Sequence, residues 1–381
     1  MLNIQSKLPG VSTTIFTVMS KLATEHNAIN LSQGFPDYAC DPNLVELVSK
    51  AMQNGFNQYA PMPGSPVLKE TIAAKVENLY KVKYNPDTEI TITAGGTQAI
   101  FTALAAIINA GDEVIIFEPA YDSYAPTIKL LGGLVKTYEL APPDYSIDWD
   151  MVKKLFTART RMIILNSPQN PTGSILSADD MKALIKLVSG TDILILSDEV
   201  YEHLIYDGQK HQSVMLYPEL KQRSFIVASF GKLLHATGWK LGYCLAPDKL
   251  TKEFRKVHQF NVFSVNSPMQ QAIATYLQTP ANYTGIAAFF QEKRDYFRNL
   301  LAESRLELLP CNGSYFQCVS YRNISDEKDT DFSMRLIKEF GVATIPVSAF
   351  YQKGTDHKII RFCFAKEHET LALAAEKLKN I

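Results

Sequence analysis

Two lysines lie eight positions apart in SFGKLLHATGWKLGY, residues 229–243 of a 381-residue chain. Lys232 and Lys240 each stand alone among apolar or small residues, whereas lysines on a solvated surface are usually scattered among other charges. A lysine that is desolvated near another cation loses its proton more easily and becomes a nucleophile, while a charged lysine can bind an anion. The segment therefore indicates one nucleophilic lysine and one anion-binding lysine.

A glycine-rich turn is a second candidate for anion binding. Gly95, Gly96 and Thr97 lie between a strand-like run and the apolar segment AIFTALAAII. Bare backbone amides at a helix N-terminus suit a phosphate, although a plain tight turn would give the same pattern. Neither GxGxxG nor GxxxxGKS/T occurs in the chain, so the usual nucleotide motifs do not explain a phosphate.

Four other side chains follow strand-like runs and could contact a flat, cationic ligand. Asp198 follows the run ILILS, where a buried carboxylate needs a cationic partner such as a ligand. A helix cap or a salt bridge with a nearby lysine is the plainer alternative. Tyr201 would lie on the same side of one helical turn as Asp198. Asn170 in NPTG can donate and accept hydrogen bonds, and Tyr121 in EPAY can stack on a heterocycle. Core packing or turn formation is the plainer alternative for the last three.

A repeated pattern between residues 89 and 230 positions these groups. Short β-branched runs are each followed by a polar cluster and a helix-like segment, which predicts parallel strands joined by crossover helices. The runs are residues 89–93, 113–117, 162–166, 193–197 and 225–229. Because ligands bind at the carboxyl ends of such strands, we expect the polar clusters to meet at one site.

Composition limits the classes of function. The formal net charge is −1, with 46% hydrophobic and 20% charged residues, so no basic excess favours nucleic acid or a membrane surface. The five cysteines are scattered without a CxxC pair, which indicates neither a disulfide framework nor a zinc site. No signal peptide or bilayer-spanning run occurs. We expect a cytoplasmic protein that holds no metal and acts on small molecules.

Together the clusters suit a flat ring with a phosphate, a cationic nitrogen and a carbonyl, and pyridoxal phosphate has all of these. SFGKLLHATGWKLGY resembles the cofactor-lysine signature of fold-type I aminotransferases, and NPTG, DEVYEH, EPAY, YAPMPG and LSQGFPD resemble other motifs of that family in the same order. SKLPGVSTTIFTVMSKLA, HQFNVFSVNSP and HKIIRFCFAK are most similar to the branch of kynurenine/glutamine aminotransferases and bacterial methionine aminotransferases.

The resemblance implies site residues. Lys232 would form the Schiff base, Asp198 would face the pyridine nitrogen, and Tyr201 would contact the 3-oxygen. The implied cofactor-binding residues are Gly95, Gly96, Thr97, Tyr121, Asn170, Asp198, Tyr201, Ser229, Lys232, Lys240 and, from a neighbouring subunit, Tyr59. The implied substrate-binding residues are Arg361, Asn170, Gly34, Phe16 and Phe263. Arg361 would hold the α-carboxylate, although by pattern alone it could be an exposed strand arginine.

Two residues depart from the commoner family pattern. Gly231 replaces a serine before the lysine, and Lys240 stands where many relatives have arginine. The phosphate would then keep a point charge in place of a bidentate partner. We expect these two departures, at Gly231 and Lys240, to affect the affinity for the cofactor.

The implied activity is transfer of the α-amino group of methionine, and of aromatic amino acids or glutamine, to a 2-oxo acid by a ping-pong mechanism through pyridoxamine phosphate. An aspartate-specific pocket would need a second arginine, and HQFNVFSVNSP has none. Phe16, Phe260 and Phe263 instead suggest a pocket for a thioether, if they do not belong to the core. A cysteine-conjugate β-lyase uses the same cofactor and lysine and stays an alternative. A transcription regulator would need a helix-turn-helix and a basic patch, and neither occurs.

The implied fold is α/β, fold type I of the pyridoxal-phosphate-dependent transferases, with a mainly parallel seven-stranded sheet. A large domain would span residues 45–280, and a smaller α/β domain would combine residues 1–44 and 281–381. The family also implies a homodimer with shared active sites, through Tyr59 and Phe263.

Overall fold

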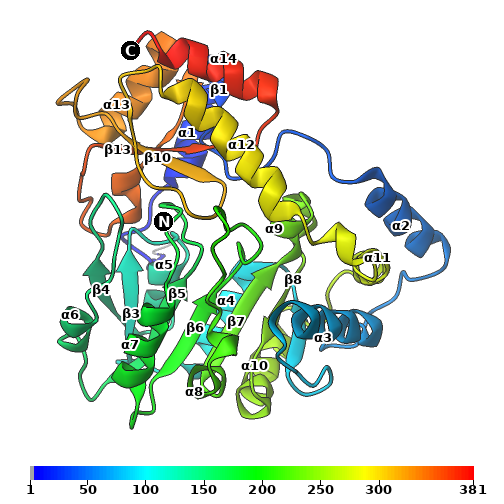
Figure 1. Cartoon of the computed structure of the whole chain (residues 1–381). Coiled ribbons are helices and arrows are strands. Elements are labelled where there is room, and N and C mark those ends of the chain that lie inside the picture. The colour runs from blue at the N-terminus through cyan, green and yellow to red at the C-terminus, as the bar shows by residue number, and fades with distance from the viewer. Residues whose placement is uncertain (1–3) are drawn as a thin grey trace.

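A seven-stranded sheet forms the larger part of the protein, in a computed structural model that describes residues 4–381 (Figure 1). Its strands are β2 (Ile90–Thr93), β3 (Glu113–Glu118), β4 (Leu134–Glu139), β5 (Thr160–Asn166), β6 (Leu194–Asp198), β7 (Ser224–Ser229) and β8 (Gly242–Leu245). The order is β2-β8-β7-β6-β5-β3-β4. Only β8 runs antiparallel to both of its neighbours, so the mainly parallel sheet is confirmed.

All five runs expected to be strands are strands, and β4 and β8 are additional. Because the inner strands are buried on both faces, they form near-continuous apolar runs that are easy to find in the sequence. Strand β4 is an edge strand that is only partly buried, and LVKTYE carries a lysine and a glutamate. Strand β8 has only four residues and begins with a glycine. Neither has the long apolar run that marks a buried strand.

Successive residues of the strands point into two separate hydrophobic cores, one on each face of the sheet. Ile115, Ile163 and Ile195 pack in one core and Val114, Ile164 and Leu196 in the other. The first core is covered by α2 (Pro42–Gln53), α3 (Pro66–Tyr80), α6 (Trp149–Lys153), α7 (Ala178–Val188), α8 (Pro218–Lys221) and α11 (Ser267–Tyr276). The second is covered by α4 (Gly96–Ile107), α5 (Tyr124–Leu130) and α10 (Asp248–Asn261).

Smaller sheets lie above the large one in Figure 1. A four-stranded antiparallel sheet has the order β12-β13-β10-β9, from β9 (Glu307–Leu308), β10 (Phe316–Ser320), β12 (Ile345–Pro346) and β13 (Ile359–Cys363). Strand β1 (Ile29–Asn30) pairs in parallel with β11 (Val342–Ala343), which joins the N-terminal segment to the C-terminal region. The helices here are α1 (Ile15–Glu25), α12 (Ile286–Leu301), α13 (Asp329–Arg335), η4 (Leu336–Phe340) and α14 (His368–Leu378).

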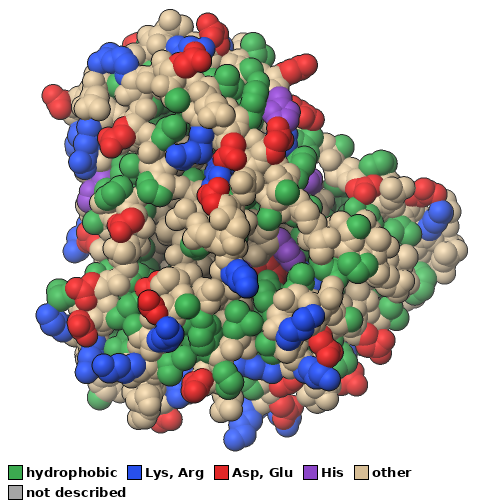
Figure 2. Space-filling view, in the orientation of Figure 1, with side chains coloured by type: hydrophobic (Ala, Val, Ile, Leu, Met, Phe, Trp, Pro, Cys, Tyr) green, Lys and Arg blue, Asp and Glu red, His purple; other side chains and the backbone are tan. Residues whose placement is uncertain are grey.

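Short helical turns complete the chain at α9 (Phe230–Leu233), η1 (Val214–Leu216), η2 (Thr237–Trp239), η3 (Pro280–Asn282) and η5 (Val347–Phe350). No helix of residues 4–381 has the length and apolar character needed to cross a membrane. The five cysteines are free thiols. Figure 2 shows basic and acidic side chains interspersed over the visible face of the described residues, which agrees with the net charge near zero.

Candidate active site

A cavity of about 190 Å³ lies where the polar clusters after β2, β3, β5, β6 and β7 meet. Its walls include every cofactor residue implied within one subunit: Gly95, Gly96, Thr97, Tyr121, Asn170, Asp198, Tyr201, Ser229, Lys232 and Lys240. Ile100, Asn166, Val200, Gly231 and Thr237 complete the lining. The parallel strands thus bring together residues that lie more than a hundred positions apart in the sequence.

Lys232 lies in the short helix α9, directly after β7. Its Nζ donates hydrogen bonds to the carbonyl oxygen of Gly34 at 3.1 Å and to the hydroxyl of Tyr315 at 2.7 Å. Burial, together with the positive charges of Arg361 and Lys240, lowers the pKa of Lys232 to about 8. A large fraction of this amine is therefore neutral near pH 8, as a nucleophile requires.

The glycines at the start of α4 leave space beside Lys240. Gly95 has a φ of 82°, and Nζ of Lys240 lies 3.5 Å from the position that a Cβ on Gly95 would take. On Gly96, a Cβ would lie 3.0 Å from Cγ1 of Val200. Any side chain at Gly95 would enter a space beside the N-terminus of α4. This space is surrounded by backbone amides and the ammonium group of Lys240, and it therefore suits a phosphate.

Asp198 ends β6 and is only 3% exposed. Tyr124 donates its hydroxyl proton to Oδ2 at 2.6 Å, and the backbone N–H of Val200 donates to Oδ1 at 3.3 Å. Burial raises the pKa of Asp198 to about 6. Asp198 forms no salt bridge with any of residues 4–381, which was one alternative considered from the sequence. This buried carboxylate can therefore pair with a cationic ligand.

Tyr201 lies in a turn, which corrects the expected helical geometry after Asp198. The hydrogen bonds run from Glu202 N to Glu199 O and from Leu204 N to Tyr201 O, over three residues each. A helix does not continue because Ile205 pairs with Gly313 in a β-bridge. The Tyr201 ring still faces the site, with its centroid 5.5 Å from Nζ of Lys232.

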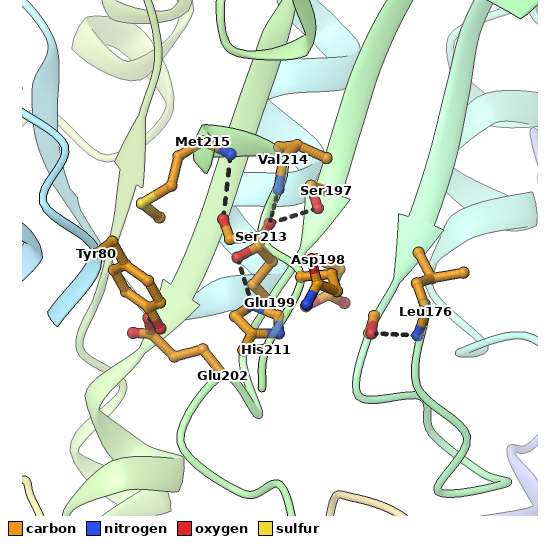
Figure 3. Close-up of polar contacts among 12 residues, drawn as sticks. Tyr80, Leu176, Ser197, Asp198, Glu199, Glu202, His211, Ser213, Val214 and Met215 are labelled. Atoms are coloured by element: carbon orange, nitrogen blue, oxygen red, sulfur yellow. Dashed lines mark hydrogen bonds and ion pairs between the residues drawn. The ribbon is translucent and has the colours of Figure 1, made fainter. Parts of the chain in front are cut away.

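Figure 3 shows how the two glutamates beside Asp198 and Tyr201 are held. Oε2 of Glu199 lies 2.7 Å from Nε2 of His211, and Oε1 accepts from Ser197 and Val214. Glu202 accepts from Tyr80, Lys75 and Tyr243 at 2.7–2.9 Å. Burial acts to raise the pKa of Glu202, but Lys75 and His203 hold it well below its ordinary value. These contacts fix the turn that carries the site residues.

Arg361 is fully buried in β13, so the alternative of an exposed strand arginine is wrong. One guanidinium nitrogen donates to Oδ1 of Asn170 at 2.7 Å and another to the carbonyl oxygen of Ser32 at 2.8 Å, whereas Nε has no partner within residues 4–381. No carboxylate of those residues forms an ion pair with it. A buried guanidinium with an unused donor suits the carboxylate of a ligand.

Aromatic rings surround this guanidinium. Its carbon lies 3.9 Å from the centroid of Phe316, 5.3 Å from that of Phe350 and 5.4 Å from that of Phe16. The chain thus brings the predicted substrate residues Phe16, Gly34 and Asn170 close to either Arg361 or Lys232.

Tyr59 and Phe263 do not line the cavity. They contact each other at the surface, with ring centroids 5.3 Å apart, and they are 82% and 41% exposed. Phe260 is 91% exposed. One chain therefore does not bring these three predicted residues to its own site.

Sequence reasoning missed Tyr124, Tyr315, Asn166 and Ser32. Tyr124 lies in the polar cluster that follows the run 113–117, and Asn166 is the last residue of the run 162–166, so their position at the end of a strand was an available signal. Ser32 lies in the quoted motif LSQGFPD, whereas Tyr315 lies in no motif that was singled out. Only the tertiary fold brings these two residues to Arg361 and Lys232.

The donor set fits pyridoxal phosphate. The buried Asp198 carboxylate has no cationic partner within the described residues, which suits a protonated ring nitrogen. Lys232 offers an amine with a lowered pKa, and the space beside Gly95 and Lys240 suits the phosphate. Tyr121, whose hydroxyl lies 3.1 Å from Oγ1 of Thr97, adds an aromatic ring to the wall.

Comparison with known proteins gives the same assignment. The profile of the family described as aminotransferase class I and II matches residues 26–378. A methionine aminotransferase from Escherichia coli is 48% identical over 378 residues, covering 99% of this chain and 98% of that protein. Kynurenine–oxoglutarate transaminase 1 from Homo sapiens is 33% identical over 410 residues, covering 98% and 97% of the two chains.

Solved structures are similar over the whole chain. The crystal structure of YbdL from Escherichia coli, described as a methionine aminotransferase, has a TM-score of 0.98 at 48% identity and covers 100% of both chains. Aspartate aminotransferase from Thermus thermophilus has a TM-score of 0.91 at 26% identity, again over 100% of both chains. These matches confirm the resemblance and the fold type inferred from the motifs. The chain belongs to the aminotransferase class I and II family, whose members use pyridoxal phosphate.

Proposed function

We propose that this aminotransferase moves the α-amino group of methionine, and of aromatic amino acids or glutamine, to a 2-oxo acid. The observation that carries the proposal is one site with three charged groups. Lys232, whose amine has a lowered pKa, and the buried Asp198 line the cavity, and the buried Arg361 is bonded to Asn170 of the cavity wall. Methionine as the donor is supported by the 48% identity to a methionine aminotransferase.

The residues around the cavity would hold the cofactor. Asp198 would pair with the ring nitrogen, Tyr121 would stack on the ring, and Tyr201 and Asn170 would contact the 3-oxygen. The phosphate would lie among Gly95, Gly96, Thr97, Ser229 and Lys240. When bound, pyridoxal phosphate supplies an electron-withdrawing ring that makes the Cα–H bond of an attached amino acid acidic.

Arg361 would bind and orient the substrate. Its guanidinium can hold the α-carboxylate through two N–H donors, and Asn170 keeps the guanidinium in place through the 2.7 Å hydrogen bond. A buried cation is costly without a counter-charge, so binding of a carboxylate here is favoured over binding of a neutral amine.

Lys232 would carry the proton. When its amine is free, Nζ would take the proton from the substrate Cα, hold it beside the bound cofactor and give it up again. The lowered pKa allows both steps near neutral pH, because the amine gains and loses a proton without a large free-energy cost.

A homodimer with shared sites would complete the substrate pocket. Tyr59 and Phe263 are exposed aromatic residues on one chain, and their counterparts from a second copy would contact the phosphate and the substrate side chain. Phe16 would supply the apolar wall from within the chain, which suits a thioether better than a second carboxylate.

The division into domains is proposed on the same grounds. A large domain of residues 45–280 would contain the seven-stranded sheet, and residues 1–44 with 281–381 would form the small domain, since β1 pairs with β11. The cytoplasmic location stays a prediction, which the five free thiols favour.

The test is an absorbance spectrum of the purified holoenzyme before and after addition of L-methionine without a keto acid. Conversion of the aldehyde-form band to the pyridoxamine-form band is the expected result. L-aspartate is the matched control and should convert the band far more slowly, because HQFNVFSVNSP, the segment expected to line the pocket from the second copy, has no arginine for a second carboxylate. An unchanged band with methionine would contradict methionine as donor.

A further inference from the structure

Tyr315 contacts the reacting atom of the site from outside the large sheet. It directly precedes β10 and is 1% exposed. Its hydroxyl donates to the carbonyl oxygen of Gly34 and accepts a hydrogen bond from Nζ of Lys232 at 2.7 Å. Nζ also donates to the same Gly34 carbonyl at 3.1 Å. The hydroxyl proton of Tyr315 is thus donated to the Gly34 carbonyl, and the hydroxyl oxygen can accept the hydrogen bond from Lys232.

The number of acceptors matches a neutral amine. A neutral lysine amine has two N–H bonds and one lone pair, whereas an ammonium group has three N–H bonds. Within residues 4–381, Nζ of Lys232 has two hydrogen-bond acceptors, Tyr315 and Gly34. If each acceptor receives a hydrogen bond from one N–H, both N–H groups of the neutral amine are used and only its lone pair has no partner. Lys232 lines the cavity, so this lone pair can receive a proton from a molecule bound there.

Both acceptors are held firmly. The Tyr315 ring packs edge-on against Tyr201 and Phe316, with centroids 5.0 and 4.9 Å away. A Cβ on Gly34 would lie 2.8 Å from Cζ of Phe316, so a larger residue could not bring its carbonyl to this position without a shift of that ring. The direction of the amine is therefore set by rigid groups, which is how proteins orient a reacting atom.

We propose that Tyr315 is a further catalytic residue, which takes one N–H of the free Lys232 amine and thereby directs the Nζ lone pair toward the substrate Cα. This rests on the proposed function for the origin of the proton. In the step, the Cα–H bond breaks, its electron pair passes to the bound cofactor, and the proton forms a third N–H bond on Lys232. Tyr315 keeps its own proton on the bond to Gly34.

The test substitutes Tyr315→Phe, which removes the hydroxyl and keeps the ring. The full-length enzyme is loaded with pyridoxamine phosphate, so that the Lys232 amine is free, and is labelled with acetic anhydride over a range of pH. Mass spectrometry of the Lys232 peptide gives the pKa of the amine. We expect this pKa to fall by about one unit, because an acceptor stabilises the ammonium form more than the neutral form.

A kinetic measurement accompanies the labelling. The methionine half-reaction should slow by roughly 10-fold or more, and its primary isotope effect with α-deuterated methionine should increase, because proton transfer becomes more rate-limiting. The methionine concentration for half-saturation should change by less than about 2-fold, because Arg361 still binds the carboxylate.

Tyr206→Phe is the matched control. Tyr206 is fully buried, and its hydroxyl donates to the carbonyl oxygen of Ser314, the residue next to Tyr315. This variant loses a buried phenol-to-carbonyl bond without touching Lys232. A wild-type pKa and isotope effect in Tyr315→Phe, or the same changes in both variants, would overturn the proposal.

If Tyr315→Phe does not fold, 3,5-difluorotyrosine at position 315 keeps the ring and hydroxyl but weakens the acceptor. A lower Lys232 pKa then supports the proposal, and an unchanged one refutes it. Labelling of Lys232 needs no turnover of methionine. If the wild-type enzyme does not react with methionine, the proposed amino donor is refuted. The labelling experiment still decides whether Tyr315 acts on the Lys232 amine.

Discussion

Nη1 of Arg361 lies 2.7 Å from Oδ1 of Asn170, so a residue of the small antiparallel sheet is bonded to a loop that follows β5 of the large sheet. The residue proposed to bind the substrate carboxylate is thereby held in a fixed relation to the cavity wall.

Arg361→Lys should raise the half-saturating concentration of methionine by roughly 100-fold, because a single ammonium group replaces a two-donor guanidinium in a buried site. The concentration dependence of the half-reaction measures this. Arg298→Lys is the control, since Arg298 bonds to Leu309 and Gln317 rather than to a cavity residue. Equal effects of the two substitutions would argue against a carboxylate site at Arg361.

Asp198→Asn should stabilise the cofactor-free protein at high pH but not at low pH. The pKa of Asp198 in the folded protein is about 6, above its ordinary value of 3.8, so the folded state binds more protons and loses stability as the pH rises through this interval. The unfolding free energy of the variant relative to the wild type should therefore increase by about 2–3 kcal/mol between pH 4 and pH 8. Urea unfolding at both pH values measures it, and a pH-independent difference would contradict a raised pKa.

Mixing two inactive variants should restore activity if the sites are shared. In a hybrid of Lys232→Ala and Tyr59→Ala subunits, one of the two sites has an intact Lys232 and an intact Tyr59. Random exchange of subunits should give about a quarter of the wild-type activity. Refolding the variants together and separately measures this gain. Absence of any gain in the mixture, with hybrid dimers present, would show that Tyr59 acts within its own chain or not at all.

Gly231→Ser should reduce cofactor affinity, although it restores the serine of the family pattern that this segment resembles. A Cβ on Gly231 would lie 2.9 Å from Cα of Thr237, so the backbone that holds Lys232 must shift. Gly238→Ser is the control in the same loop, because nothing lies within 4 Å of a Cβ there. Titration of the cofactor-free variants with pyridoxal phosphate measures both affinities, and equal affinities would contradict the steric argument.

The sequence determined the strands that carry the site. Runs such as residues 193–196 are apolar throughout because both faces of the strand are buried, and polar residues follow because the carboxyl ends of parallel strands face the ligand. This local pattern was enough to locate Asp198, Lys232 and the glycines at positions 95 and 96.

Only the tertiary structure decided what surrounds them. Arg361 lies in a short strand whose sequence does not distinguish a buried from an exposed arginine, and its burial arises from packing against Phe316 and Ser32. Tyr315 and Gly34 meet at Lys232 from segments 281 positions apart. Local sequence patterns report hydrophobic periodicity and turns, whereas contacts between distant segments depend on how the whole chain packs. The motif LSQGFPD pointed to Gly34, but its contact with Lys232 and the presence of Tyr315 could not be found from the sequence alone.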